Sequence, residues 1–203
     1  KYIEVGNGTG LGAYRKVKGA LDDDTYLKNS TPFKNKSHIG VFFIPGIGTK
    51  EDIKKFKEEG GDFIRIGMNA TQSEEAIEYI EYAKSLELFV CFNFMKTYAV
   101  SPYQIAFRSN ELINSGADCI YVVDSSGGML PVQVVKYFYA LKIAYNVKLG
   151  FHGHNNLLMA NANSLTAIDS GATFVDSTLM GMGRGTGNAQ TESLIALLSK
   201  SRK

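Results

Sequence analysis

The chain lacks the sequence features of several protein classes. Its 203 residues include only two cysteines, Cys91 and Cys119. Each lies in an apolar segment without C-x-x-C spacing, so neither a disulfide framework nor a zinc knuckle is indicated, and we expect buried free thiols. No apolar run approaches the roughly 20 residues that span a bilayer, and no basic-then-apolar signal opens the chain. We therefore expect a cytoplasmic protein without a membrane partner.

The charge pattern gives no sign of a nucleic-acid partner. The formal net charge is +2, and lysines alternate with glutamates along the expected helices rather than forming a basic stripe. The 44% hydrophobic and 21% charged residues are typical of a globular domain with a core. A small-molecule ligand is the partner that this composition favours.

Short β-rich segments alternate with longer segments whose apolar residues have helical spacing. The expected strands are residues 2–5, 39–44, 63–68, 88–95, 119–123, 148–151 and 174–177. Thr71 followed by Glu74 predicts a capping box, Ser101 before Pro102 predicts a helix start, and Pro131 predicts another.

A weak repeat supports this alternation. Gly60-Gly61-Asp62, Gly116-Ala117-Asp118 and Gly171-Ala172-Thr173 each precede an expected strand. A glycine in the left-handed conformation ends a helix and lets the chain turn back into the sheet. The nearly continuous apolar strands indicate a parallel sheet covered by helices.

Seven βα units predict an α/β fold, a TIM (β/α)8 barrel whose first βα unit is absent from this sequence. The alternative is a doubly wound open sheet, which would gather its polar residues at one switch point. Here polar residues follow several strands, which favours the barrel. They are Asn7, Asn69, Asp124 with Ser125, His152 with His154, and Asp176 with Ser177.

The segment Gly150-Phe151-His152-Gly153-His154-Asn155-Asn156 is the most informative. Residues two apart in a strand share a face, so both imidazoles can converge on one metal ion. Two histidines leave coordination positions open, as in a catalytic site. The alternative is a pair of loop histidines hydrogen-bonded to backbone.

Two further loops carry candidate ligand groups. The stretch 181–188 has glycine at every second position, which lets backbone approach a ligand and can hold Asn188 toward the site; the alternative is a flexible connector. Ser125 can donate to a substrate carboxylate, and the alternative is an Asx or Ser turn at Asp124-Ser125.

Three other polar residues have simpler interpretations. We interpret Arg65 as the partner of Glu4 in a structural ion pair, and His38 as a solvated residue before a strand. Apart from Lys148 at the first position of the expected strand 148–151, no lysine lies inside an expected inner strand. Lys96 lies just beyond the expected strand 88–95 and stays a candidate for a Schiff-base lysine.

Together, several segments resemble the 4-hydroxy-2-oxovalerate aldolases, which belong to the superfamily of HMG-CoA lyase and isopropylmalate synthase. These segments are IEVG from Ile3, IRI from Ile64, Asp124-Ser125, GFHGHNN from Gly150, Asp176 and GMGRGTGNA from Gly181. The resemblance implies one HMG-CoA lyase-like, pyruvate carboxyltransferase-type barrel domain over residues 1–203, truncated at the N-terminus and at the C-terminus.

The resemblance also implies a divalent metal, most often Mn2+, with Mg2+, Co2+ or Zn2+ as alternatives. His152 and His154 match the family's metal-binding pair, Asn188 is a second-rank metal ligand, and Ser125 matches a serine that contacts pyruvate. The family's TLRDG-like first-strand segment is not in this sequence. With it would come the metal-binding aspartate, the arginine that stabilises the enolate and the histidine base, so the catalytic residues are expected upstream. A tyrosine in the family's C-terminal helical region is also missing.

The expected function is a carbon–carbon lyase, a class II aldolase that cleaves a 4-hydroxy-2-oxoacid, such as 4-hydroxy-2-oxopentanoate, to pyruvate and an aldehyde. The alternatives are a Claisen-type acyl-CoA lyase or condensing enzyme and a non-catalytic barrel that acts as a binding module. The resemblance is compatible with an aldehyde dehydrogenase partner of aromatic degradation or with a homo-oligomer.

Overall fold

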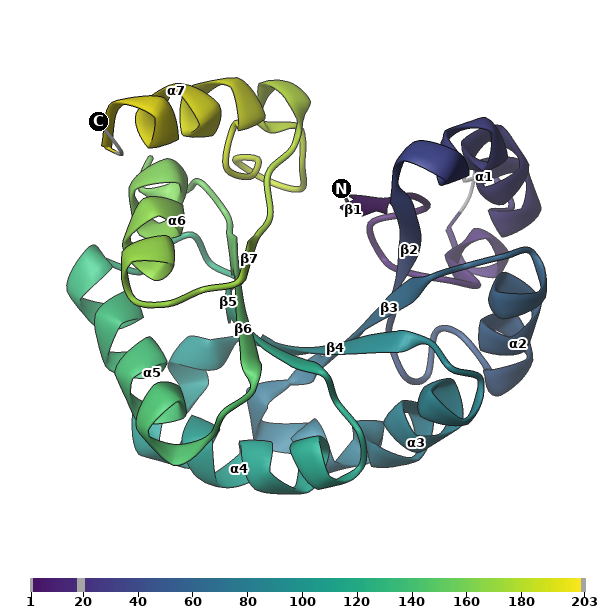
Figure 1. Ribbon diagram of the computed structural model, residues 1–203, viewed down its shortest axis with the longest axis horizontal. Coiled ribbons are helices and arrows are strands. Elements are labelled where there is room, and N and C mark those ends of the chain that lie inside the picture. The colour runs from purple at the N-terminus through teal and green to yellow at the C-terminus, as the bar shows by residue number, and fades with distance from the viewer. Residues whose placement is uncertain (1, 18–20, 202–203) are drawn as a thin grey trace. The chain divides into compact units, whose positions relative to one another are not determined.

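The computed structural model describes residues 2–17 and 21–201, which form two compact units (Figure 1). The first unit comprises Lys1–Met68, Ser73–Phe92 and Glu111–Asp118. The second comprises Asn69–Gln72, Asn93–Asn110 and Cys119–Lys203. Strand β4 (Phe89–Met95) and helix α4 (Pro102–Asn114) each contribute residues to both units.

Parallel strands in chain order form the sheet of the first unit. Strand β1 pairs with β2, and β2 pairs with β3. The strands and helices of this part are β1 (Tyr2–Glu4), η1 (Ala13–Arg15), α1 (Asp23–Ser30), η2 (Thr31–Lys36), β2 (His38–Phe43), α2 (Lys50–Glu58), β3 (Phe63–Asn69), η3 (Ala70–Ala76) and α3 (Ile77–Ser85). The end of β3 and the start of η3, Asn69–Gln72, belong to the second unit.

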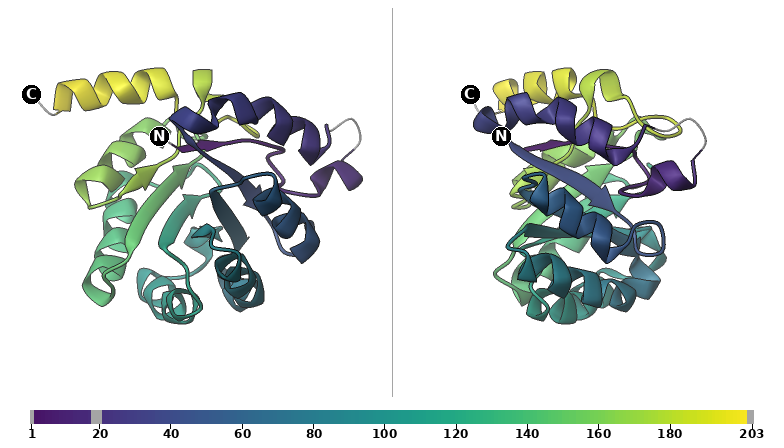
Figure 2. Two further views of the ribbon diagram at one scale, coloured as in Figure 1. Left: turned by 45° about the vertical axis from the view of Figure 1, so that its right-hand side comes forward. Right: turned by 90° about the vertical axis from the view of Figure 1, so that its right-hand side faces the viewer.

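The second unit repeats this arrangement. Strand β5 pairs in parallel with β6, and β6 with β7. The elements are η4 (Thr97–Ala99), β5 (Cys119–Asp124), α5 (Pro131–Ala144), β6 (Lys148–Gly153), α6 (Ala160–Asp169), β7 (Phe174–Val175), η5 (Leu179–Gly181) and α7 (Thr191–Ser201). Helices α5 and α6 lie along one side of these strands in Figures 1 and 2.

All seven predicted strands are present, with ends that differ by three residues or fewer. Helix α4 begins at Pro102, where Ser101 accepts from Gln104 N and its own N–H donates to Gln104 Oε1. Helix α5 begins at Pro131 as predicted. The capping box predicted at Thr71 is wrong, because Gln72 has non-helical φ and ψ and α3 begins only at Ile77.

The glycine repeat ends three helices in one way. Gly60, Gly116 and Gly171 have φ of 88°, 108° and 105°. The N–H after each glycine reaches back to a carbonyl five residues earlier, as in Ala117 N to Leu112 O at 3.0 Å. Each turn therefore closes a helix with left-handed glycine, as the sequence predicted.

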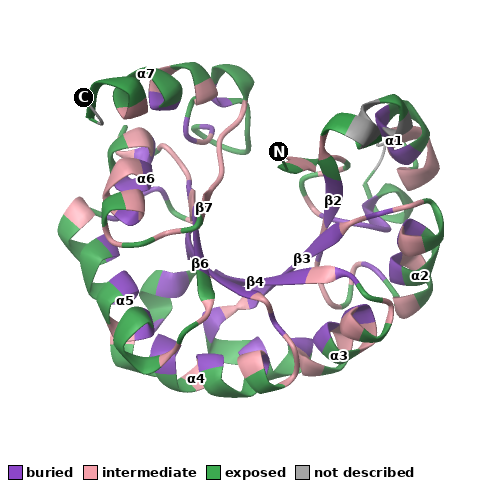
Figure 3. Cartoon of the chain, in the orientation of Figure 1, coloured by how far each residue is buried: buried purple, intermediate pink, exposed green. Residues whose placement is uncertain are grey.

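The core lies between the strands and the helices. Strand β5 is buried along its whole length, and β3 is buried except at Asn69. Figure 3 shows mostly buried strands, whereas helices such as α4 and α5 carry both buried and exposed residues. Cys91 and Cys119 are buried and free, as predicted. In the described part of the chain, no helix has the length and apolarity to cross a membrane.

Candidate metal and substrate site

Strand β6 brings two imidazoles together. His152 lies in the strand, opposite Val123 of β5, and His154 follows one residue after its end. The two ring centroids are 5.1 Å apart and the ring planes cross at 78°. The two imidazoles therefore lie close together, and their convergence on one metal ion stays a prediction.

Asp176, directly after β7, orients the first imidazole. Its Oδ2 lies 2.9 Å from His152 Nδ1, and both side chains are largely shielded from solvent. An ionised carboxylate only accepts hydrogen bonds, so Nδ1 is the donor, and in the neutral tautomer with this proton Nε2 has a lone pair. A carboxylate behind a histidine in this way fixes the tautomer and ring direction of a metal ligand. The sequence placed Asp176 at a strand end without assigning it this role.

The second imidazole is held in its neutral form. Burial lowers the pKa of His154 below its usual range, and the neighbouring His152 adds to the effect. The backbone N–H of His154 donates to Asp124 O at 3.2 Å. A neutral imidazole with a fixed backbone can ligate a metal.

The glycine-rich loop places Asn188 beside this pair. His154 and Asn188 form an antiparallel backbone bridge, and Asn188 Nδ2 donates to Met182 O at 3.1 Å. Asn188 Oδ1 is buried and has no hydrogen-bond partner. Gly183 leaves room for this amide, since a Cβ there would lie 2.5 Å from Asn188 Nδ2. A buried, unsatisfied oxygen is costly unless a ligand completes it.

These side chains fit a divalent metal in part. Two imidazole nitrogens and one unsatisfied amide oxygen are donors that such an ion accepts. The carboxylate of Asp176 orients one of the imidazoles. Among the described residues, no three His, Cys, Asp or Glu side chains gather into a metal-binding group. Among the described residues, the candidate donors are therefore His152 and His154, with Asn188 beside them.

Asp124 and Ser125 have different roles at the end of β5. Asp124 is fully buried, and its carboxylate accepts from Gly128 N and Met129 N at 3.1 and 2.9 Å. Asp124 therefore forms a turn, which was the alternative interpretation of Asp124-Ser125. Ser125 Oγ accepts the Lys96 N–H at 2.8 Å, which leaves the hydroxyl proton available to a ligand.

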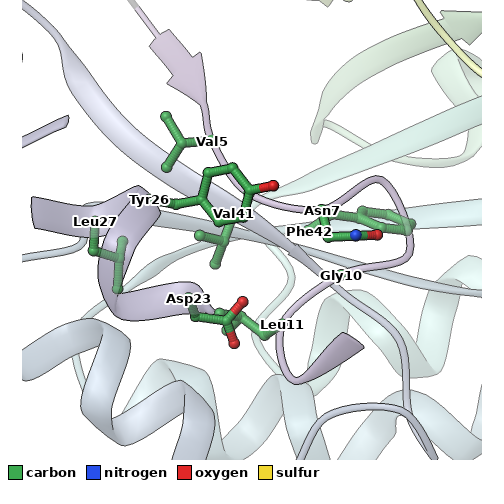
Figure 4. A pocket seen from close by; sticks show the side chains of 10 residues that line it. Val5, Asn7, Gly10, Leu11, Asp23, Tyr26, Leu27, Val41 and Phe42 are labelled. Carbon is green, nitrogen blue, oxygen red and sulfur yellow. The ribbon is translucent and has the colours of Figure 1, made fainter. Parts of the chain in front are cut away.

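The first unit contains the ion pair and the exposed histidine that the sequence predicted, and it also contains a cavity. Arg65 Nη1 lies 2.9 Å from Glu4 Oε2, which confirms the predicted ion pair, and His38 is exposed as predicted. Asn7 accepts from the Thr9 N–H in a local turn. A cavity with an empty volume of about 220 Å³ lies beside this turn (Figure 4). Its lining is Val5, Gly6, Asn7, Gly10, Leu11, Asp23, Tyr26, Leu27, Val41 and Phe42.

That cavity is not the metal site. Of its lining residues, only Asn7 was a predicted strand-end polar residue. Its carboxylate, Asp23, accepts the Gly12 N–H at 2.7 Å, and burial raises its pKa. The lining is otherwise mainly apolar (Figure 4). The histidine pair is not part of this lining and belongs to the second unit.

The HMGL-like family profile matches residues 64–202, which include β5, β6, β7 and the glycine-rich loop. The chain belongs to the HMGL-like family. This HMGL-like chain is 38% identical over 200 residues to a 4-hydroxy-2-oxovalerate aldolase of Carboxydothermus hydrogenoformans, over 98% of this chain and 60% of that protein. A second relative of that name, from Moorella thermoacetica, is also 38% identical and is covered to 60%.

A solved relative supports the same fold. The N-terminal domain of a candidate aldolase from Bacteroides vulgatus superposes with a TM-score of 0.81 at 29% identity, covering 100% of this chain and 68% of that one. Together with parallel strands in chain order, it identifies a TIM-barrel-type fold, as predicted. The HMGL-like chain spans about three fifths of the length of the curated relatives it matches.

Proposed function

We propose that the protein is a divalent-metal-dependent aldolase that cleaves a 4-hydroxy-2-oxoacid, such as 4-hydroxy-2-oxopentanoate, to pyruvate and an aldehyde. The observation that carries the proposal is the pair His152 and His154 with Asp176 hydrogen-bonded to His152 Nδ1 at 2.9 Å. Curated relatives named 4-hydroxy-2-oxovalerate aldolase support it. Within the same proposal the protein is cytoplasmic, and an aldehyde dehydrogenase or a second copy of the chain is its protein partner.

The metal would be held by His152 and His154, with Asn188 Oδ1 as the third donor of this chain. Nitrogen and oxygen donors suit Mn2+, and also Mg2+, Co2+ and Zn2+. A divalent ion bound there supplies a Lewis acid for negative charge on the substrate's 2-oxo oxygen. Asp176 keeps the His152 Nε2 lone pair free by holding the proton on Nδ1.

Ser125 would bind the substrate beside this centre. Because its oxygen already accepts the Lys96 N–H, its own O–H donates to the carboxylate of the pyruvate portion. The reaction removes the 4-hydroxyl proton and breaks the C3–C4 bond, which releases the aldehyde. The electron pair stays on the pyruvate enolate, which gains a proton at C3 to become pyruvate.

The test is an assay of the full-length gene product for pyruvate release from 4-hydroxy-2-oxopentanoate, with added Mn2+ and with EDTA. We expect release with Mn2+, loss with EDTA, and a fall of at least about 100-fold in His152→Ala, because one metal ligand is gone. His38→Ala is the matched control and should retain activity, since His38 is exposed on β2.

Two results would overturn the proposal. If the protein binds Mn2+ and releases no pyruvate, a Claisen-type lyase of the same family becomes the better explanation. If the protein binds no metal, a non-catalytic barrel that acts as a binding module becomes the better explanation.

A further inference from the structure

Lys96 has an unfavourable backbone conformation directly after β4. Its φ and ψ are 53° and 43°, in the left-handed region, where a residue with a Cβ carries a conformational cost. It is one of four non-glycine residues with positive φ in the described chain. Such a conformation persists only where the surrounding structure fixes it, and it is frequent at functional sites.

The loop that carries Lys96 is fixed from three sides. The Lys96 N–H donates to Ser125 Oγ at 2.8 Å. The fully buried Thr97 hydroxyl donates to Phe94 O at 2.7 Å and accepts the Val123 N–H at 3.0 Å. Tyr137 of α5 donates to Val100 O at 2.8 Å. Lys96 is therefore presented on a rigid support, not on a freely moving loop.

Hydrogen bonds connect the backbone of Lys96 to the candidate site. Ser125, which binds its amide, directly follows Asp124, whose carbonyl accepts the His154 N–H. The ends of β4, β5 and β6 are thus linked within the second unit by one backbone-to-side-chain hydrogen bond and one backbone hydrogen bond. Three residues before Lys96, Asn93 is 1% exposed and its Oδ1 has no hydrogen-bond partner.

The side chain of Lys96 has no structural task of its own. It is exposed, and its ammonium makes no hydrogen bond or ion pair with any described residue. Glycine would adopt the same backbone without cost. The chain therefore retains a cation at a position where backbone geometry alone favours glycine.

We propose that the Lys96 ammonium binds the carboxylate of the 2-oxoacid, together with the Ser125 hydroxyl. This inference rests on the proposed function and names a carboxylate-binding residue for it. An ammonium has three donors and no acceptor, and its charge favours an anionic carboxylate oxygen over a neutral keto or hydroxyl oxygen. Arg184 of the glycine-rich loop is the competing cation, because its charge acts on His154.

The experiment measures pyruvate binding to the Mn2+-loaded full-length gene product by calorimetry, alongside a separate Mn2+ titration. Lys96→Met and Lys96→Gly should weaken pyruvate binding by roughly 10- to 100-fold, the worth of a charge-assisted hydrogen bond. Mn2+ affinity should stay within about twofold. Lys96→Arg should recover part of the loss. Lys136→Met, which removes an exposed lysine from α5, is the matched control and should bind as wild type.

Lys96→Gly adds a readout that a structural role would not give. Because glycine relieves the left-handed conformation, this variant should melt at a higher temperature than wild type while it binds pyruvate more weakly. A lower melting temperature in Lys96→Gly would overturn the inference, since the side chain would then stabilise the fold.

The other outcomes separate the two proposals. Unchanged pyruvate binding in both Lys96 variants, or a loss in Arg184→Met alone, would overturn the role of Lys96 and leave the aldolase proposal standing. Reduction with borohydride that attaches pyruvate covalently to Lys96 would also overturn it, because the lysine would then be a Schiff-base nucleophile. If wild-type protein binds Mn2+ but no pyruvate, both proposals fail.

Discussion

At the scale of single residues, the candidate site depends on a contact between the ends of two strands. His152 is a useful ligand only in the tautomer with a free Nε2, and Asp176 supplies the acceptor that sets this tautomer. The sequence distance between the two residues is 24. No local pattern links them, so only the β6–β7 pairing reveals the contact.

Asp176→Asn tests that contact. We expect Mn2+ affinity to fall by about 10- to 100-fold, the usual cost of losing the residue behind a metal-binding histidine. The measurement is a Mn2+ titration in which the electron paramagnetic resonance signal of free Mn2+ is followed. Asp169→Asn, which changes an exposed carboxylate of α6, is the control and should leave the affinity unchanged. Equal affinities for all three proteins would show that Asp176 does not position a ligand.

The sequence predicted some of these residues and not others, for physical reasons. The alternation of a strand brings His152 and His154 to one face, so the pair could be found from spacing alone. Asp124 is the last residue of β5, yet its buried carboxylate accepts from two backbone N–H groups of a turn. Whether a strand-end carboxylate faces a ligand or a turn depends on the hydrogen bonds around it, which sequence does not show.

At the scale of elements, the glycine-rich loop 181–188 is a folded structure held by its own backbone. Asn188 N donates to Gly181 O at 2.9 Å, and Asn155 N donates to Gly187 O at 2.9 Å. Gly187 has a φ of 86°, and a Cβ there would overlap Gly181 O. These contacts hold both ends of the loop beside His154, which favours a ligand-holding loop over a flexible connector.

Gly187→Ala and Gly185→Ala separate a steric requirement from backbone strain. Gly185 also has positive φ, 61°, but apart from its chain neighbours no atom lies within 4 Å of the position that an alanine Cβ would take. Gly185→Ala should cost about 1–2 kcal/mol in unfolding free energy and leave Mn2+ affinity nearly intact. Gly187→Ala should cost more and weaken Mn2+ binding at least about tenfold, because Asn188 must move. Urea unfolding and Mn2+ titration measure both; equal behaviour of the two variants would contradict this account of the loop.

Element boundaries were predictable where local chemistry decides them. Pro102 and Pro131 begin helices because proline suits the first helical turn. Thr71 failed as a cap because Asn69 Nδ2 bonds Gln72 Oε1 at 3.0 Å and Gln72 leaves the helical region. A side-chain contact between neighbouring residues thus overrode a correct-looking capping pattern.

At the scale of the whole molecule, the order of the strands follows the order of the chain in each unit. This order, with helices between parallel strands, is what the seven apolar segments predicted. The histidine pair, Asn188, Ser125 and Lys96 all belong to the second unit. Among the described residues, no carboxylate joins the two histidines in a group of three metal-binding side chains.

The central claim is that the histidine pair supports formation of a pyruvate enolate. The most direct measurement is exchange of the pyruvate methyl protons in heavy water, followed by proton NMR, since it does not depend on which aldehyde the enzyme uses. We predict that the full-length gene product exchanges these protons with Mn2+, and that EDTA or His152→Ala abolishes the exchange. Exchange that persists in EDTA or in His152→Ala, or none in Mn2+-loaded wild type, would contradict the claim.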